Sequence, residues 1–443
     1  MSRTWLNMRA ADLGREIGAG RINPIDLTEL LLDTIAKHPL ADRIFARTTP
    51  ARARAEAMAA TTRARRGWRH GLLDGVPISW KDLFDTADVA TEAGSALLRN
   101  RVPKRDAEVL SVATQGGLVC LGKTHMSELA FSGLGLNPVT ETPPCINDED
   151  AVAGGSSSGA AASVAYGLSP AGIGSDTGGS VRIPAAWNDL VGLKTSAGRL
   201  SLRGVVPLCE RFDTVGPLAK SVEDCALLLS ALEGTRPIDL SGGTLAGTRL
   251  MVLETVALDD LREGPERGFD DAVSRFSGAG AKIERIKAPE VAEAMALAGI
   301  LFATEAYGIW RDTIEAAPAK MFPRILERFR SGDSVSAPEY VAGWRRLEQL
   351  RRIYADRVAG YDAVLVPTSP ILPPNAERLM QDNDYYVTEN LLALRNTRIG
   401  NLMGLCALTL PTIEPSCGVC LMAPPMAEER LLRLGCAAEK ALR

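Results

Sequence analysis

The chain has 443 residues, of which 46% are hydrophobic, and its 50 Lys and Arg against 54 Asp and Glu give a formal net charge of −4. This near balance provides no basic surface for a nucleic acid or an anionic membrane, so neither is an expected partner. Because the Pro and Gly clusters are short and no polar linker interrupts the sequence, we expect one large domain.

The apolar pattern predicts helices that alternate with strands through the middle of the chain. The first expected helix covers residues 11–37, with a break at Pro24. Further helices are expected at 51–66, 106–116, 160–168, 221–233, 265–276 and 338–358. Ser221 is the expected N-cap of its helix, and the arginine-rich last helix is expected to have a solvated face. The alternation predicts an α/β fold with a mixed central β-sheet sandwiched between helices.

Targeting segments, disulfides and metal sites are not expected. The first nine residues lack the apolar core of a signal peptide, and no stretch is expected to reach the ~18–20 apolar residues of a membrane span. We therefore expect a cytoplasmic protein. The eight cysteines are scattered, and the single C-x-x-C pair, Cys417 and Cys420, has neither a second pair nor a nearby histidine. Buried core thiols and no metal are expected.

Two glycine-rich turns that carry hydroxyl groups flank the expected helix at 160–168. The first reads Gly154-Gly155-Ser156-Ser157-Ser158-Gly159, and the second runs from Gly174 to Pro184 and contains Ser180. Glycine reaches positive φ without penalty, so such turns let several backbone N–H groups point into one cavity. A flexible linker is the alternative, but each turn leads directly into an apolar run. We expect an oxyanion cradle for acyl transfer, formed by Thr177, Gly178, Gly179 and Ser180.

A nucleophilic serine needs a base, and the histidines of this chain are poorly placed to supply one. His38, His70 and His125 all precede both turns. Residues 155–159 match the G-x-S-x-G elbow of α/β-hydrolases, but that fold places its histidine after the nucleophile, which argues against Ser157 in this role. A lysine is a known alternative partner for serine.

Lys81 is the candidate base because it ends a short apolar, β-rich run that begins at Gly75. A base must be neutral, so the lysine pKa must fall from ~10.4 to around 7 or 8, which corresponds to roughly 4 kcal/mol. Full burial lowers a lysine pKa by up to about 3–5 units. Desolvation beside apolar neighbours is therefore sufficient to lower the pKa of Lys81 into the range that a base requires.

With these motifs, the chain resembles the amidase signature family. The resemblance rests on residues 75–81, 154–159, 174–185, 191–194 and 213–219, which occur in the family's order and spacing. It implies a single amidase domain over residues 1–443. Its expected parts are an N-terminal helical segment at 1–66, a signature core at 67–235, a variable substrate region at 236–360 and a C-terminal part of the core at 361–443.

The resemblance implies a role for each serine and for the lysine. Ser180 is the implied nucleophile, Lys81 the general base and acid, and Ser156 the hydroxyl that relays the proton between them. In the family the serine equivalent to Ser156 follows a cis peptide bond. Ser157 and Ser158 are implied supporting hydroxyls, and no cofactor is needed.

Further residues are expected to support the turn or to contact the substrate. Asp176 and Arg182 flank the oxyanion turn and are expected to hold its shape as a buried ion pair. Selectivity is expected to come from the variable region and from residues 395–405. His125 is more simply a structural hydrogen-bonding residue than a catalytic one. Candidate pocket residues, for which core packing is the alternative, are Met126, Ser157, Trp80, Phe131, Tyr307 and Trp310.

A phosphate-loop pattern, G-x-x-x-x-G-K-[ST], is also present at Gly117–Thr124. A phosphate loop needs a flexible turn between its glycines, whereas this stretch has the bulky apolar run Leu-Val-Cys-Leu. The run predicts a buried parallel strand around Val119. Nucleotide binding is therefore an unfavoured alternative.

The expected activity is hydrolysis of the C–N bond of a small amide, a urea-like compound or a carbamate through an acyl-enzyme on Ser180. A homodimer is a possible assembly. Within the family, the alternative is the glutaminase subunit of a tRNA-dependent amidotransferase, which would need partner subunits. Ile183 argues against it, since those subunits often carry Gln after the arginine of this motif. A non-catalytic binding protein is disfavoured because Lys81, Ser156 and Ser180 are all retained.

Overall fold

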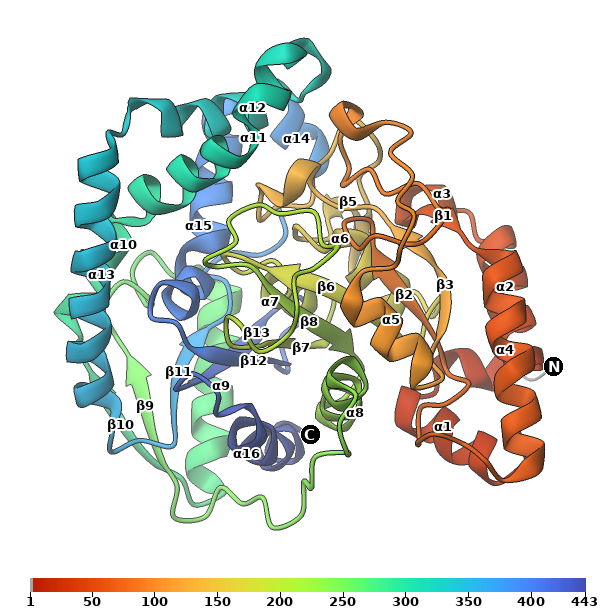
Figure 1. Ribbon diagram of the computed structural model, residues 1–443. Coiled ribbons are helices and arrows are strands. Elements are labelled where there is room, and N and C mark those ends of the chain that lie inside the picture. Colours follow the sequence, from red (N-terminus) through yellow and green to blue (C-terminus); the bar gives the residue numbers. More distant parts are fainter. Residues whose placement is uncertain (1–2) are drawn as a thin grey trace.

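A mixed sheet of 11 strands forms the centre of the computed structural model, which describes residues 3–443 (Figure 1). Its strand order is β1-β3-β2-β6-β8-β7-β12-β13-β11-β9-β10, and β4 and β5 form a separate pair. The strands are β1 (Phe45–Thr48), β2 (Pro77–Lys81), β3 (Val119–Thr124), β4 (Pro144–Cys145), β5 (Asp148–Val152), β6 (Ala171–Asp176), β7 (Val191–Lys194), β8 (Thr214–Ala219), β9 (Arg249–Leu253), β10 (Lys282–Ile286), β11 (Ala363–Pro367), β12 (Cys406–Pro411) and β13 (Gly418–Ala423).

Parallel pairing is confined to two parts of this sheet. Strand β2 runs parallel to both β3 and β6, and β9 runs parallel to both β10 and β11. The strands from β6 through β8, β7, β12 and β13 to β11 pair antiparallel. The predicted mixed α/β sheet is confirmed.

The helices cover the two faces of the sheet and its ends. They are α1 (Ala10–Gly18), α2 (Pro24–Lys37), α3 (Ala41–Ile44), α4 (Pro50–Arg66), α5 (Glu108–Gln115), α6 (Ser158–Ala165), α7 (Arg182–Trp187), α8 (Val222–Glu233), α9 (Glu263–Gly278), α10 (Pro289–Ala296), α11 (Thr304–Ala316), α12 (Pro323–Arg330), α13 (Ala337–Val358), α14 (Ala376–Gln381), α15 (Asn383–Leu402) and α16 (Glu428–Leu442). Short helical turns are η1 (Arg3–Asn7), η2 (Ala96–Leu98), η3 (Glu128–Ala130), η4 (Gly299–Ala303), η5 (Pro318–Lys320) and η6 (Ser331–Ser334).

The predicted helices are confirmed, with ends that differ by a few residues. The first helix is interrupted as expected, because α1 ends at Gly18 and Pro24 begins α2, where its fixed φ suits the first helical position. Ser221 caps α8, since its side chain accepts a hydrogen bond from the amide of Asp224. Helix α13 begins with a complete capping box formed by Ser336 and Glu339.

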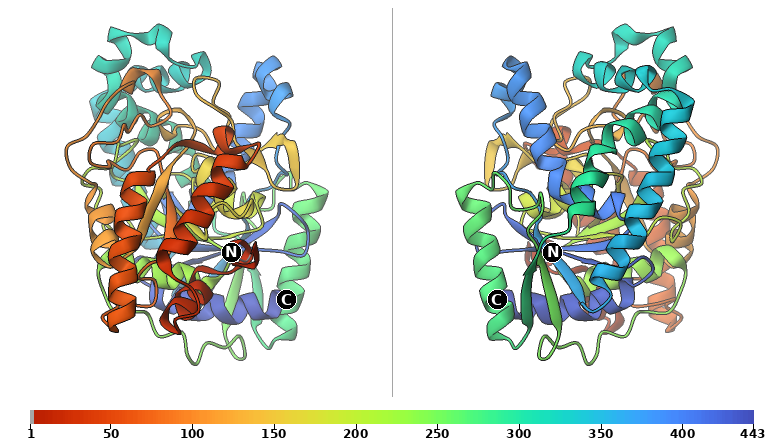
Figure 2. Two further views of the ribbon diagram at one scale, coloured as in Figure 1. Left: turned by 90° about the vertical axis from the view of Figure 1, so that its right-hand side faces the viewer. Right: turned by 90° about the vertical axis from the view of Figure 1, so that its left-hand side faces the viewer.

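Alternating side chains on β12 separate the two helical layers. Successive strand residues point to opposite faces, so Leu408 and Thr409 lie on different sides of the sheet. On one face, Leu408 packs against Gly435 of α16. On the other face, Thr409 and Ala186 of α7 both lie next to Gly418 of β13. Helix α8 packs with α16, and α6 packs on β6 and β2 near α7. The N-terminal helices and the α10–α13 segment lie at opposite sides of the molecule (Figure 2).

The helical run Pro289–Ala316, which spans α10, η4 and α11, has 28 residues and is long and apolar enough to cross a bilayer by length and composition. One such run is weak evidence for a membrane span, because a core helix meets the same criteria, and Glu290, Glu293 and Glu305 interrupt its apolar residues. In the fold, α10 packs against α13 and α15 and buries Val291 and Ala294, while Leu301 of η4 is also buried. The run is thus an integral part of the helical layer.

The phosphate-loop pattern at residues 117–124 forms a strand instead of a loop. All six residues of β3 are buried, and β3 lies parallel to β2 in the sheet. The amine of Lys123 lies 3.2 Å from the carboxylate of Asp82 inside the fold. The predicted buried strand is confirmed, and the backbone has no turn here that could wrap a phosphate.

Cys417 and Cys420 are buried free thiols. Cys420 lies on β13, which is covered on both faces. Among residues 3–443, no group of three or more His, Cys, Asp or Glu side chains is arranged to hold a metal ion.

Candidate active site

Lys81 lies at the end of β2, completely buried, where the strand meets the end of its parallel neighbour β6. Carboxyl ends of parallel strands share one edge of a sheet, so Lys81 is brought next to Ser175 of β6. Its Nζ donates hydrogen bonds to Oγ of Ser175 at 2.8 Å and to Oγ of Ser156 at 2.7 Å.

The environment of Lys81 favours the neutral amine. Burial lowers the pKa of Lys81 to about 7, although the negative charges of Asp176 and Asp213 oppose this shift. Near neutral pH a substantial fraction of this amine is therefore able to accept a proton.

The first glycine-rich turn carries Ser156 after a cis peptide bond with Gly155, as the resemblance implied. The next two serines hold the turn in place. The Ser157 amide donates to the carbonyl of Ser180 at 3.1 Å, and its hydroxyl bonds to the backbone of Ser175 at 3.2 and 3.3 Å. Ser158 begins α6, and its hydroxyl reaches the His125 carbonyl at 3.5 Å. The two turns are thus tied together by backbone contacts.

Ser180 is 3% exposed and lines a small cavity that is partly open to solvent. Within residues 3–443 its hydroxyl makes no hydrogen bond, either to Ser156 or to another side chain. The hydroxyl of Ser180 is therefore available to contact a molecule in the cavity.

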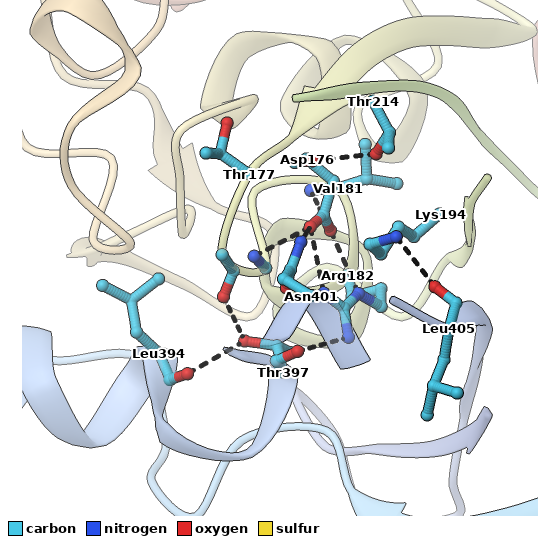
Figure 3. Close-up of polar contacts among 12 residues, drawn as sticks. Asp176, Thr177, Val181, Arg182, Lys194, Thr214, Leu394, Thr397, Asn401 and Leu405 are labelled. Carbon is cyan, nitrogen blue, oxygen red and sulfur yellow. Dashed lines mark hydrogen bonds and ion pairs between the residues drawn. The ribbon is translucent and has the colours of Figure 1, made fainter. Parts of the chain in front are cut away.

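The second turn is held in shape by the carboxylate of Asp176 (Figure 3). It accepts from the amides of Gly179 at 2.9 Å and Val181 at 3.1 Å. It also pairs with the Arg182 guanidinium through two hydrogen bonds of 3.0 and 2.9 Å. Burial alone would raise the pKa of Asp176, but Arg182 outweighs this and holds it below its usual range. The predicted buried pair of Asp176 and Arg182 is present.

Helix α15 supports this turn from below (Figure 3). Arg182, with no exposed surface, donates to the carbonyl of Thr397 at 2.7 Å and to the side-chain oxygen of Asn401 at 2.6 Å. The Thr397 hydroxyl in turn donates to the carbonyl of Gly178 at 2.8 Å. Gly179 has φ +136°, and a Cβ there would lie 2.1 Å from Oγ1 of Thr397. Only glycine fits between this turn and the helix.

The amides of the turn divide into two groups. The Gly179 amide is engaged by Asp176, which differs from the expectation that it points at a substrate. Within the described chain, the amides of Gly178 and Ser180 have no hydrogen-bond acceptor. Thr177 lines the cavity, while its hydroxyl donates to Asp213. The amides of Gly178 and Ser180 are therefore free to donate to another group.

Most of the expected pocket residues lie outside the cavity. Met126 is buried, and its carbonyl accepts from Asn137 at 2.8 Å, away from the cavity wall. Trp80 packs edge-on against Phe84, and Trp310 donates to the carbonyl of Pro207. Of the aromatic candidates, only Phe131 lines the cavity. The cavity lining is Ala130, Phe131, Ser132, Thr177, Gly178, Ser180, Leu208, Phe302, Arg328, Leu394 and Arg398.

His125 and Tyr307 have structural surroundings. The carbonyl of His125 accepts from the amide of Gly159 at 3.0 Å, and burial lowers the pKa of its side chain to about 4. The Tyr307 hydroxyl donates to Glu315 at 3.1 Å. Neither residue is among those that line the cavity beside Ser180.

Comparison with known proteins identifies the family. The family model described as Amidase matches residues 26–432. The chain belongs to the amidase signature family. This amidase is 36% identical over 444 residues to the 2-amino-5-chloromuconic acid deaminase of Comamonas testosteroni, and the match covers 96% of this chain and 95% of that protein. This chain is a hydrolase that acts on amide C–N bonds.

Two further similarities extend over nearly the whole amidase. A glutamyl-tRNA(Gln) amidotransferase subunit of Thermobifida fusca (strain YX) is 31% identical over 480 residues, covering 99% of this chain and 96% of that protein. A solved crystal structure of an amidase superposes with a TM-score of 0.88 at 28% identity, covering 98% of this chain and 100% of that chain. The sheet and helices described above are therefore those of this family.

Some residues of the site were missed by the sequence prediction. Ser175 lies in the second glycine-rich segment, next to Asp176 on β6. Neighbouring strand residues face opposite sides of the sheet, so this alternation could have predicted that Ser175 faces away from Asp176. Asn401 and Thr397 are more than 200 residues from Arg182 in the chain. No local pattern connects those residues with the turn.

Proposed function

We propose that this amidase cleaves its substrate through an acyl-enzyme on Ser180, with Lys81 as general base and acid and Ser156 as proton relay. The proposal rests chiefly on the 2.7 Å hydrogen bond between Nζ of Lys81 and Oγ of Ser156, in a turn that is tied to Ser180 by the Ser157 amide. The lowered pKa of Lys81, about 7, supplies a base that is partly neutral at physiological pH.

In the first half-reaction, the Ser180 oxygen attacks the carbonyl carbon while its proton passes to Ser156. Ser156 transfers its own proton to the neutral amine of Lys81. The carbonyl oxygen becomes an anion, which in this mechanism accepts hydrogen bonds from the amides of Gly178 and Ser180; both amides are otherwise unpaired in the described chain. Removing one such donor in other enzymes slows catalysis by about 10²–10³-fold.

Collapse of the tetrahedral intermediate breaks the C–N bond. The proton held by Lys81 returns through Ser156 to the leaving nitrogen, so the first product is ammonia or an amine. Water then attacks the acyl ester, its proton follows the same path to Lys81, and the carboxylic acid product leaves when Ser180 regains a proton. The net reaction converts the amide and one water molecule into a carboxylic acid and ammonia or an amine, and it needs no other reactant.

A second candidate, the glutaminase role, is favoured by the similarity to the amidotransferase subunit of Thermobifida fusca. In that case the released ammonia would pass to a partner subunit. Ile183 stands where those subunits often carry glutamine, which favours the free-standing amidase. Glutamine turnover that depends on added partner subunits would favour the glutaminase role.

The experiment combines active-site labelling with a substrate panel. A fluorophosphonate probe is expected to modify Ser180, and peptide mass spectrometry identifies the modified residue. Primary amides, anilides, urea derivatives and glutamine are then assayed for ammonia or amine release by the wild type and by Ser180→Ala. Labelling at Ser157, or full turnover by Ser180→Ala, would contradict the assignment.

A further inference from the structure

Two arginines from different helices line the cavity beside Ser180. Arg328 comes from α12, in the variable region, and Arg398 comes from α15, one residue after Thr397. The apolar walls between them include Phe131, Phe302 and Leu394. The arrangement places two guanidinium groups in the same small space as the proposed nucleophile.

Neither guanidinium is neutralised by a carboxylate. Arg328 donates to the carbonyl of Phe131 at 3.0 Å and lies over its ring, 4.4 Å from the centroid. Arg398 lies 5.8 Å from the centroid of the Phe302 ring, and in the described part of the chain it has no hydrogen bond or ion pair. Elsewhere in this fold, Arg182 and Arg199 pair with carboxylates, whereas Arg351 donates only to backbone carbonyls.

The nearby acidic side chains are already satisfied by other donors. Glu128 accepts from the Ser95 hydroxyl and the Phe322 amide, each at 2.8 Å. Asp213 accepts from Thr177 and from the backbone amides of Leu208 and Cys209. The two positive charges in the cavity are therefore uncompensated by the protein.

Holding such charges without a partner is unfavourable. Burial, with repulsion from Arg328, lowers the pKa of Arg398 to about 9, and burial lowers the pKa of Arg328 to about 10. Both remain protonated at neutral pH. Both arginines are partly buried, so water also reaches them, but the planar fork of a guanidinium matches a carboxylate and pairs with it strongly.

We propose that Arg328 and Arg398 together bind a carboxylate group of the substrate while the scissile amide lies against Ser180. This inference rests on the proposed function of Ser180 and specifies its substrate class. The substrate is a short amide that also carries a free carboxylate, such as the monoamide of a small dicarboxylic acid.

Matched substrates test the charge requirement directly. Succinamate and its methyl ester contain the same primary amide, but only succinamate has the carboxylate. We expect the wild type to favour succinamate in kcat/KM by roughly 100-fold, as charged hydrogen bonds of this kind contribute. A ratio near one, or a preference for the ester, would overturn the proposal.

Substitutions of the arginines test which residues carry the preference. Arg328→Gln and Arg398→Gln are each expected to reduce the succinamate-to-ester ratio about tenfold or more, mainly through KM. Lysine at either position should restore part of the ratio because the charge returns. Arg330→Gln is the control, since Arg330 lies on the same helix but pairs with exposed Glu315. A ratio unchanged in both glutamine variants would contradict the assignment.

A binding measurement separates this proposal from the chemistry of Ser180. Succinate is expected to raise the melting temperature of Ser180→Ala, whereas neutral succinamide is not. The shift should disappear when Arg328→Gln and Arg398→Gln are combined in that background, with each variant's own melting temperature as its baseline. Absence of a succinate shift in Ser180→Ala overturns the carboxylate site, even if the serine chemistry is correct. A succinate shift in a protein whose Ser180 does not react would instead refute only the proposed mechanism.

Discussion

Nζ of Lys81 lies 2.7 Å from Oγ of Ser156 and 2.8 Å from Oγ of Ser175, and among the described residues no carboxylate pairs with it. A buried ammonium with only neutral partners is poorly stabilised, because two hydroxyl groups replace the water that would solvate it. The neutral amine, by contrast, can accept from one hydroxyl. This relationship makes the protonation state of Lys81 sensitive to pH near neutrality.

The first prediction concerns the pH dependence of kcat/KM. Below its pKa of about 7, Lys81 is protonated and cannot accept the serine proton, so activity should fall tenfold for each unit of decreasing pH. Above that value the amine is neutral and activity should reach a plateau. The profile measured on any turned-over amide should therefore rise through about pH 7, with a slope of one.

Glu128 provides the control for this profile, because burial also raises its pKa to about 7. Glu128→Gln should retain the rising limb, since the carboxyl is bonded to Ser95 and Phe322 and has no hydrogen bond to Lys81, Ser156 or Ser180. Lys81→Ala should lose several orders of magnitude in rate, as loss of a triad member does in other serine enzymes. If the limb disappears in Glu128→Gln, or persists in Lys81→Ala, the assigned base is wrong.

The second prediction ranks the three adjacent serines. Ser156→Ala should be the most damaging to kcat, because it removes the only hydroxyl bonded to Lys81 within the first turn. Ser157→Ala and Ser158→Ala remove supporting bonds, each worth about 0.5–1.5 kcal/mol, or roughly a tenfold effect. The backbone bond from the Ser157 amide to Ser180 survives substitution by alanine.

The ranking is checked by single-turnover rates, with circular dichroism to confirm folding. Ser175→Ala belongs in the same series, because Ser175 also bonds to Lys81. Equal and small losses in all four variants would indicate that Lys81 acts on Ser180 directly or through water. A larger loss in Ser175→Ala than in Ser156→Ala would indicate that Ser175 of β6, and not Ser156, is the proton relay.

The sequence predicted the local parts of this structure well and the long-range parts poorly. Pro24, Ser221 and the apolar run before Thr124 act within a few residues, through fixed φ, capping and burial, so the helices and β3 were predictable. The unsuitable positions of the histidines and its own apolar flank make Lys81 the candidate base. The family resemblance implies which serine is the nucleophile, Ser180, and which is the proton relay, Ser156.

The cavity wall could not be predicted in the same way. Arg328 and Arg398 reach it from separate helices. The regions that contain them, 236–360 and 395–405, were expected to contribute to selectivity, but no local pattern distinguishes either arginine. Met126 was expected beside the substrate, yet the packing of residues around Gly94 and Asn137 places it in the core. Such side-chain positions depend on how distant helices cross the sheet, which no periodicity records.

The third prediction concerns the buried pair of Arg182 and Asp176. Arg182→Lys keeps a charge but loses the fork that joins Asp176, Thr397 and Asn401, so buried polar groups are left unpaired. The free energy of unfolding should fall by about 3 kcal/mol, within the range found when buried pairs are broken. Urea unfolding measures this change.

Arg267→Lys is the matched control for that substitution. Arg267 pairs with Glu414 at 3.0 Å on the surface, where an ion pair is typically worth less than about 1 kcal/mol. A comparable loss of stability in both variants would show that the Arg182 network does not hold the turn. Activity of Arg182→Lys should also fall, because the same carboxylate positions the amides of Gly179 and Val181.

The last prediction compares two neighbouring glycines of the oxyanion turn. Gly179→Ala should destabilise the protein, because φ is +136° there and the new Cβ would meet Oγ1 of Thr397 at 2.1 Å and its Cβ at 2.7 Å. Gly178→Ala is the control, since its new Cβ would meet only Leu394 at 3.6 Å, an ordinary contact. We expect a loss of about 1–3 kcal/mol for Gly179→Ala and of less than about 1 kcal/mol for Gly178→Ala. Urea unfolding, which does not depend on turnover, distinguishes these outcomes. Equal losses of stability would show that α15 moves to accommodate the new Cβ at residue 179. Thr397→Ala should recover only part of the Gly179→Ala loss, because it removes Oγ1 but leaves the Cβ contact and the unfavourable φ.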